Sequence, residues 1–185
     1  ELYAAGTRSV EFCGGGEPTL YPRLDDIVLH GRKLGLSFGL LTNGSTLSGR
    51  LADIAVRELS YIRVSMNAAT AEKYAQIHRP HSTISLDTIT GNIASLISER
   101  NRIGGHLLIS IKMLVSSLNY TEIPAMFELV RSLGVDSLQF KALRMSSAEI
   151  SSELAKEIGE TVARLGAEYP NVRVVAGIGK TNVQR

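Results

Sequence analysis

The run Cys13-Gly14-Gly15-Gly16-Glu17-Pro18 combines residue types that together can bind a ligand. Three consecutive glycines expose bare backbone, so a ligand can approach the chain without meeting a Cβ atom. The run follows a short strand-like segment, Val10-Glu11-Phe12, and Glu17 therefore falls where α/β folds place their chemistry. We predict a backbone cradle with one carboxylate, suited to a ligand that carries an ammonium group. A purely structural Gly-Pro turn is the alternative.

A second group of polar residues ends another strand-like segment, in the run Arg63-Val64-Ser65-Met66-Asn67-Ala68-Ala69-Thr70. Because side chains alternate along a strand, Ser65 and Asn67 share one face at its C-terminal end. Their hydroxyl and amide groups can bond a ligand without adding charge. The alternative is an ordinary strand end followed by a helix cap, and Thr70 fits such a cap.

Two lysines, Lys112 and Lys141, fall on the polar faces of neighbouring strand-like segments. A cation there can pair with the carboxylate of a ligand or with an anionic substrate. Solvated surface is the alternative. A third possibility is a different class of enzyme, a (β/α)-barrel lyase or aldolase, in which desolvation lowers the pKa of one lysine so that it forms a Schiff base.

Metal and nucleotide sites find little support in the sequence. Cys13 is the only cysteine, and a buried single cysteine usually behaves as a small hydrophobic residue. The four histidines, His30, His78, His81 and His106, form no metal-binding pattern, and His78 and His81 are expected in a loop. The segment Gly177–Thr181 imitates the end of a P-loop, but Val174 stands where the first glycine is required.

The elements that must position these residues alternate between short β-rich segments and amphipathic helical segments. Glycines at 35, 104, 105 and 134 are expected to end helices. The repeated βα order predicts a parallel sheet with right-handed crossovers. We expect strands at Ser9–Cys13, Leu36–Thr42, Tyr61–Met66, Leu107–Val115, Ser137–Leu143 and Val172–Ala176, and helices at Arg23–Leu34, Gly49–Leu59, Leu86–Asn101, Tyr120–Leu133 and Ser147–Glu168, with a helical turn after Thr70.

The alternation of apolar and polar residues within the strands distinguishes between possible architectures. Four of them place apolar residues on one face and polar residues on the other, whereas 36–42 is apolar on both faces. A doubly wound sheet would be apolar on both faces of its strands, and a full TIM barrel packs its interior with branched apolar residues. The sequence therefore predicts an α/β fold, a partial (β/α)6-type TIM barrel with parallel strands and a wet centre.

Composition sets the remaining limits. The chain has 185 residues, a net charge of +2 and 44% hydrophobic residues, typical of one globular domain. The charge is too small to indicate a nucleic-acid partner, and no apolar stretch is long enough to indicate a membrane span. Residues 1–6 read as the tail of a helix closed by a glycine. We expect residues 1–185 to be a single partial barrel, cut at both ends and lacking its first strand.

These motifs, in this order, resemble the radical S-adenosylmethionine (SAM) superfamily from about Gly6 to Ala176. The family's CxxxCxxC motif, which holds a 4Fe-4S cluster, is missing. The resemblance implies that Gly15-Gly16-Glu17-Pro18 holds the amino group of SAM. It also implies that Ser65 and Asn67 contact the ribose or carboxylate, although Asn67 replaces the usual aspartate. Asn43, in a TNG turn, would shape the pocket floor, and Arg79 would meet the carboxylate.

The resemblance further implies the activity of the full-length protein. A 4Fe-4S cluster, with ligands outside this chain, would cleave SAM reductively to a 5'-deoxyadenosyl radical that abstracts hydrogen from a substrate, with a peptide or protein as the candidate substrate class. The electron donor would be a flavodoxin or ferredoxin, and the location cytoplasmic. This chain alone would be inactive, because one thiolate cannot hold such a cluster. A cluster-free metabolite-binding module remains a further alternative.

Overall fold

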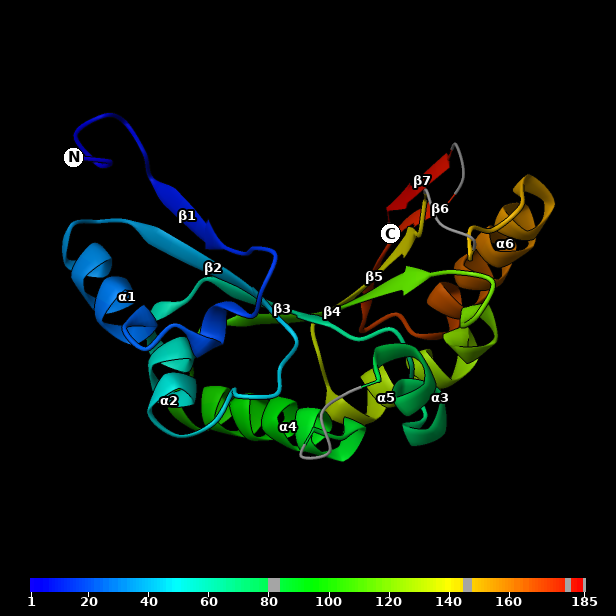
Figure 1. Ribbon diagram of the computed structural model, residues 1–185, viewed down its shortest axis with the longest axis horizontal. Helices are drawn as coiled ribbons and strands as arrows, with labels where there is room; N and C mark the ends of the chain where they lie inside the picture. Colours follow the sequence, from blue (N-terminus) through cyan, green and yellow to red (C-terminus); the bar gives the residue numbers. More distant parts are fainter. Residues whose placement is uncertain (80–83, 145–147, 179–180, 185) are drawn as a thin grey trace. The chain divides into compact units, whose positions relative to one another are not determined.

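Figure 1 shows a computed structural model of the protein, which describes residues 1–79, 84–144, 148–178 and 181–184. The strands are β1 (Ser9–Phe12), β2 (Ser37–Thr42), β3 (Tyr61–Ser65), β4 (Leu108–Val115), β5 (Ser137–Ala142), β6 (Arg173–Ile178) and β7 (Thr181–Gln184). The α-helices are α1 (Leu24–Lys33), α2 (Gly49–Glu58), α3 (Ala71–His78), α4 (Leu86–Ile103), α5 (Ile123–Leu133) and α6 (Ser152–Glu168). Two 3₁₀ turns, η1 (Pro18–Leu20) and η2 (Tyr120–Glu122), precede α1 and α5.

The strands follow one another in the sheet in the order of the sequence, from β1 to β7. β1, β2 and β3 pair in parallel, as do β4, β5 and β6, while β7 runs antiparallel to β6. The six strands expected from the sequence are all present, each within two residues of its predicted ends. The α/β class with parallel strands between helices is therefore confirmed. β7 was not expected.

The chain divides into two compact units. The first unit comprises Glu1–Val64 and Thr88–Ile109, and the second comprises Ser65–Asp87 and Ser110–Arg185. The boundary passes through β3 and β4, so each of these strands begins in the first unit and ends in the second.

In the first unit, one face of the sheet packs against helices. Phe38 and Leu40 of β2 are only 2% and 1% exposed, and the Phe38 ring lies directly against Gly31 of α1. The opposite face carries Glu11, which is exposed, and Arg63, which is half-buried. The predicted division into an apolar and a polar face is therefore confirmed for β1 and β3, as is the depth of β2.

The second unit repeats this division. Met113 of β4 and Phe140 of β5 are fully buried, and the ring of Phe127 in α5 packs on Phe140 with centroids 5.6 Å apart. Lys112 and Gln139, which alternate with them, are half-buried on the other face. In β5 this face carries Ser137, Gln139 and Lys141, as the sequence predicted, whereas in β4 it carries Lys112 together with the apolar Leu114.

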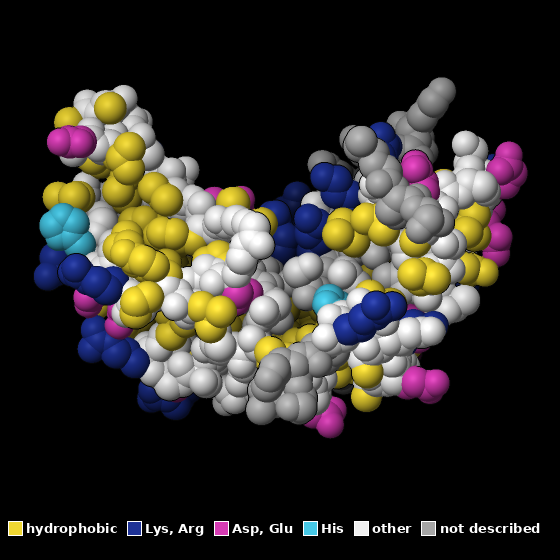
Figure 2. All heavy atoms as spheres, in the orientation of Figure 1, with side chains coloured by type: hydrophobic (Ala, Val, Ile, Leu, Met, Phe, Trp, Pro, Cys, Tyr) yellow, Lys and Arg dark blue, Asp and Glu magenta, His cyan; other side chains and the backbone are white. Residues whose placement is uncertain are grey.

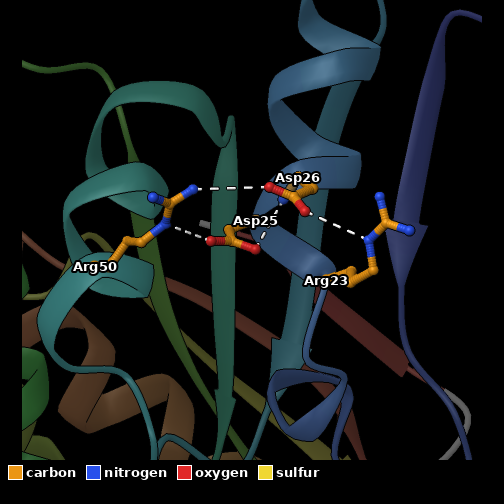
Figure 3. Close-up of polar contacts among 4 residues, drawn as sticks. All are labelled: Arg23, Asp25, Asp26 and Arg50. Carbon is orange, nitrogen blue, oxygen red and sulfur yellow. Dashed lines mark hydrogen bonds and ion pairs between the residues drawn. The ribbon is translucent and has the colours of Figure 1, made fainter.

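Charged side chains join α1 to α2 in the first unit (Figure 3). Arg50 of α2 donates from Nε to Asp25 at 2.6 Å and lies 3.7 Å from Asp26, which Arg23 also contacts at 3.4 Å. The hydrogen bond from Arg50 lowers the pKa of Asp25. Both aspartates also lie in the first turn of α1, where the helix dipole favours negative charge. None of the helices among the described residues is long and apolar enough to cross a bilayer.

Candidate functional site

Glu17 is the centre of the hydrogen bonding that follows β1. Its Oε1 accepts from the hydroxyls of Thr19 and Thr42, each at 2.6 Å, and from the Thr19 N–H at 3.2 Å. Its Oε2 accepts from the N–H of Asn43 at 2.7 Å. The carboxylate thus fastens the glycine loop to the end of β2. Because a carboxylate has about four acceptor positions, Oε2 retains capacity for a further donor.

Asn43 shapes the turn that receives this bond. Its Oδ1 accepts from the N–H of Ser45 at 2.8 Å, the arrangement of an Asx turn, and Gly44 has a φ of 81°. Asn92 of α4 stabilises the turn by donating from Nδ2 to the carbonyl oxygens of Gly44 and Ser45, at 2.9 and 3.2 Å. Asn43 therefore fixes the geometry of this turn, and its place at the floor of a SAM pocket stays a prediction.

The glycines of the loop meet no other part of the chain. A Cβ atom built on Gly14, Gly15 or Gly16 has no heavy atom within 4 Å apart from its sequence neighbours. None of the three has a positive φ. Neither packing nor a positive φ within the described residues requires glycine here, and the bare backbone leaves the loop open to the approach of an external group.

A pocket opens beside this loop within the first unit. It has a volume of about 330 Å³, and its walls include Cys13, Gly14, Gly16 and Glu17 together with Tyr21. This volume lies in the range of small-molecule sites. The pocket therefore joins residues of the glycine loop to an aromatic and apolar wall, to which Phe12, Leu24 and Ile27 also belong.

In the second unit, Asn67 continues the hydrogen bonding beyond the last residue of β3. Its Oδ1 accepts from the N–H of Leu114 at 2.9 Å, and its own N–H donates to Nε2 of His78 at 3.3 Å. Burial lowers the pKa of His78, which keeps Nε2 available as an acceptor. His78 is the last residue of α3 and stacks on Tyr74, rather than lying in a loop as expected. His81 falls outside the described residues.

Two residues that sequence reasoning missed hold this region together. Asn119 is 1% exposed and donates from Nδ2 to the carbonyl oxygens of Asn67 and Leu114, each at 2.8 Å. Glu122 accepts at Oε2 from the N–H groups of Ala69 and Thr70, at 3.0 and 2.9 Å. The only sequence signal for them was their place in polar connections after β4.

The remaining predicted site residues come from three different strands and from the end of one helix. Ser65 is half-buried at the end of β3, and Arg79 is exposed with a φ of 43° directly after α3. Lys112 of β4 pairs in register with Gln139, while Lys141 of β5, which is exposed, pairs with Leu114 one pleat further along.

The described residues do not fit an iron–sulfur cluster. Cys13 is an exposed free thiol, and no group of three histidine, cysteine or acidic side chains in these parts of the chain is placed to hold a metal ion. A 4Fe-4S cluster needs three or four thiolates. Any such cluster would therefore need ligands from outside these residues.

Comparisons with known proteins agree with the fold. No protein-family model matches the chain. It is 28% identical over 134 residues to the tungsten-containing aldehyde ferredoxin oxidoreductase cofactor-modifying protein of Pyrococcus furiosus, a match that covers 71% of this chain and 36% of that protein. The chain thus spans about a third of the length of this curated relative.

Solved structures of radical SAM enzymes share the architecture at low identity. SuiB of Streptococcus suis bound to S-adenosylmethionine superposes with a TM-score of 0.72 at 14% identity, covering 91% of this chain and 37% of SuiB. A domain of pyruvate-formate lyase-activating enzyme from Bacteroides vulgatus gives 0.71 at 16% identity, covering 92% and 99%. The enzyme anSMEcpe with bound AdoMet gives 0.70 at 16% identity, covering 93% and 51%. The resemblance stated from the sequence is therefore confirmed for the fold, and the Schiff-base lyase alternative is not favoured.

Proposed function

We propose that this chain is the SAM-binding core of a radical SAM enzyme. The observation that carries the proposal is the glycine loop after β1, because its three glycines are required by nothing in the described chain. The loop is anchored by Glu17, whose Oε2 retains an acceptor position that suits an ammonium group. A carboxylate–ammonium pair is a charge-assisted hydrogen bond, stronger than a neutral one.

Each unit contributes its own part of the proposed binding machinery. In the first, the backbone of Gly15 and Gly16 and the carboxylate of Glu17 orient the amino group of SAM, with Pro18 beginning the turn η1 that carries Thr19 back to Glu17. In the second, Ser65 and the amide of Asn67 bond the ribose or the carboxylate. Asn67 is well suited to this role because its backbone is held on both sides, by His78 and by Asn119.

Cations of the second unit extend this proposal. Arg79, Lys112 and Lys141 are candidates for pairing with the carboxylate of SAM or with an anionic substrate. A 4Fe-4S cluster with ligands outside the described residues would supply the electron for reductive cleavage of SAM, fed by a flavodoxin or ferredoxin. The protein's own contribution is binding, orientation and exclusion of water.

A peptide or protein is the proposed substrate. Two of the similar structures support this class, because SuiB was solved bound to its precursor peptide SuiA, and anSMEcpe was solved with AdoMet and the Kp18Cys peptide. Both matches cover about nine-tenths of this chain, at 14% and 15% identity.

The test separates binding from folding. Gly15→Ala and Gly16→Ala add a Cβ that meets nothing within the chain, so the thermal midpoint should stay within a few degrees of wild type. SAM affinity, measured by calorimetry, should fall at least tenfold because the added methyl group occupies the ligand's place.

The control must be a glycine that tolerates alanine. Gly49→Ala does not qualify, since Gly49 has a φ of 56°. Gly159→Ala in α6, which also meets nothing within 4 Å, is the matched control and should leave SAM affinity unchanged. Unchanged affinity in both loop variants would rule out this site.

A further inference from the structure

Three neighbouring strands of the first unit carry a polar arrangement that the proposed SAM site does not use. Glu11 of β1, Gly39 of β2 and Tyr61 of β3 stand side by side in register. The Tyr61 hydroxyl donates to Oε2 of Glu11 across β2. The tyrosine side chain thus spans the middle strand and lies flat on the polar face of the sheet.

Gly39 is what makes this crossing possible. A Cβ atom at this position would stand 2.3 Å from Cζ of Tyr61 and 2.4 Å from Cε1, closer than real contacts allow. The φ of Gly39 is not positive, so the conformation of the backbone does not call for glycine. The close approach of the ring is therefore the reason for glycine in the middle of β2, where it otherwise weakens a strand.

Arg63 lies two residues beyond Tyr61 on the same face of β3, with its guanidinium 5.7 Å from the centroid of the Tyr61 ring. It is half-buried, yet it makes no ion pair with any residue that the structure describes. By contrast, the exposed arginines Arg57 and Arg102 of the same unit both pair with Glu99. A half-buried guanidinium with a ring beneath it and no carboxylate partner is prepared to receive an anion.

We propose that Arg63, supported by the Tyr61 ring, binds a carboxylate group of the substrate. The planar fork of arginine matches the two oxygens of a carboxylate, and the bond from Tyr61 to Glu11 fixes the ring on which the guanidinium rests. Arg63 precedes Ser65 by two residues on the same face of β3, so the bound group would lie about 7 Å further down the strand than the proposed ribose contact. The proposal rests on the proposed function, because it assigns the carboxylate to the molecule that reacts with SAM. For a peptide, an acidic side chain or the C-terminus supplies it.

The experiment uses a glutamate residue with neutral ends. N-acetyl-glutamate N-methylamide is titrated into the ¹⁵N-labelled chain, and the Nε–H signal of Arg63 is followed by NMR, with the glutamine counterpart as the uncharged comparison. The carboxylate probe should shift this signal saturably and the amide should not. In Arg63→Gln the affinity, followed at the Tyr61 amide, should fall at least tenfold, and Arg63→Lys should recover only part of it. Arg57→Gln, on the helical side of the unit, should bind as wild type does.

SAM serves as the second arm, because its own carboxylate is the competing source of the anion. The proposal requires Arg63→Gln to keep its SAM affinity within about twofold. A loss of SAM affinity equal to the loss of probe affinity would overturn the proposal, because Arg63 would then bind the carboxylate of SAM and not that of the substrate. Equal probe binding by wild type and Arg63→Gln, or equal shifts from the glutamine counterpart, would also overturn it. Failure of the SAM proposal itself is recognised separately, by unchanged SAM binding in Gly15→Ala and Gly16→Ala.

Discussion

The backbone N–H of Asn43, after β2, donates to Oε2 of Glu17, after β1, over 2.7 Å. This bond joins the ends of two adjacent strands through a side chain that the sequence marks as a ligand contact. The carboxylate of Glu17 thus fastens the loop, and Glu17 also lines the pocket beside it. Its proposed second role is to hold the ammonium group of SAM.

Glu17→Gln tests both roles together. The amide nitrogen of glutamine cannot accept a hydrogen bond, so the variant loses the bond from the backbone N–H of either Asn43 or Thr19, and the threonine hydroxyls must turn to accept where they now donate. We expect the free energy of unfolding in urea to fall by about 1–3 kcal/mol. SAM affinity should fall as well. Glu157→Gln, at an exposed position on α6, should change neither quantity, and full stability in Glu17→Gln would show that the four contacts contribute little.

Two helical glycines of the first unit should respond to alanine with opposite signs. In α1, a Cβ at Gly31 would stand 2.2 Å from Cζ of Phe38, a ring that is only 2% exposed. Gly31→Ala should therefore cost about 1–3 kcal/mol of unfolding free energy, even though alanine favours helices. In α4, a Cβ at Gly91 meets nothing within 4 Å. Gly91→Ala should stabilise by up to about 1 kcal/mol, and matching signs in the two variants would contradict the packing of α1 on β2.

Tyr61 should ionise later than the other tyrosines. Burial and the bond to Glu11 raise its pKa to about 12. Because this value exceeds the unfolded value of about 10, its contribution to stability is present below pH 10 and is lost as the pH rises towards 12. Ultraviolet titration of the six tyrosines should show a late component that disappears in Tyr61→Phe. Gly39→Ala should move this component towards pH 10 by displacing the ring, whereas an unmoved component would argue against the crossing over β2.

His78 should make the second unit sensitive to acid. Burial lowers its pKa, so its contribution to stability is present above the unfolded value near 6.5 and is lost as the pH falls through the lower, folded value. Protonation also removes the acceptor that receives the Asn67 N–H. The His78 signal in NMR should titrate below pH 6.5. The protection factor of the Asn67 amide, its exchange rate relative to the intrinsic rate at the same pH, should be lower at pH 5 than at pH 7. His106→Gln, at an exposed position, should leave this pH dependence intact. Protection of the Asn67 amide that does not change with pH would show that His78 does not accept its hydrogen bond.

Anaerobic reconstitution of this chain with iron and sulfide should give no stoichiometric 4Fe-4S absorbance, because Cys13 is its single thiol. Cys13→Ser should give the same spectrum as wild type. A stable cluster at one per chain would contradict the view that its ligands lie outside these residues.

The strands were predictable because their alternation is regular, and Ile62, Val64 and Met66 are each fully buried as the pattern requires. β7 was missed because Thr-Asn-Val-Gln offers a single apolar residue and so no period. Helix α6 begins later than expected, since Ser151 caps it by accepting from the Leu154 N–H. The expected start of this helix, at residue 147, falls outside the described residues.

The sequence named candidate site residues but not the hydrogen bonds between them. Glu17 and Asn43 were both identified, yet their contact joins positions 26 residues apart and has no local signal. Asn119 and Glu122 were missed for the same reason, since each reaches backbone groups more than 50 residues away. A single polar side chain in a loop carries no periodicity, so only the folded backbone reveals its partner. The predicted SAM contacts themselves remain predictions.

On the proposed function, stability and ligand binding make opposite demands on the glycine loop. Figure 2 shows one face of the molecular surface, in the orientation of Figure 1. Replacing Gly14, Gly15 or Gly16 with alanine reduces the freedom of the unfolded chain and meets no obstacle in the described fold, so each change should raise heat resistance slightly. Selection for thermostability alone should therefore favour alanine at these positions. A library screened only for survival on heating should accumulate alanines in the loop, and the enzymes it yields should be durable and unable to hold their cosubstrate.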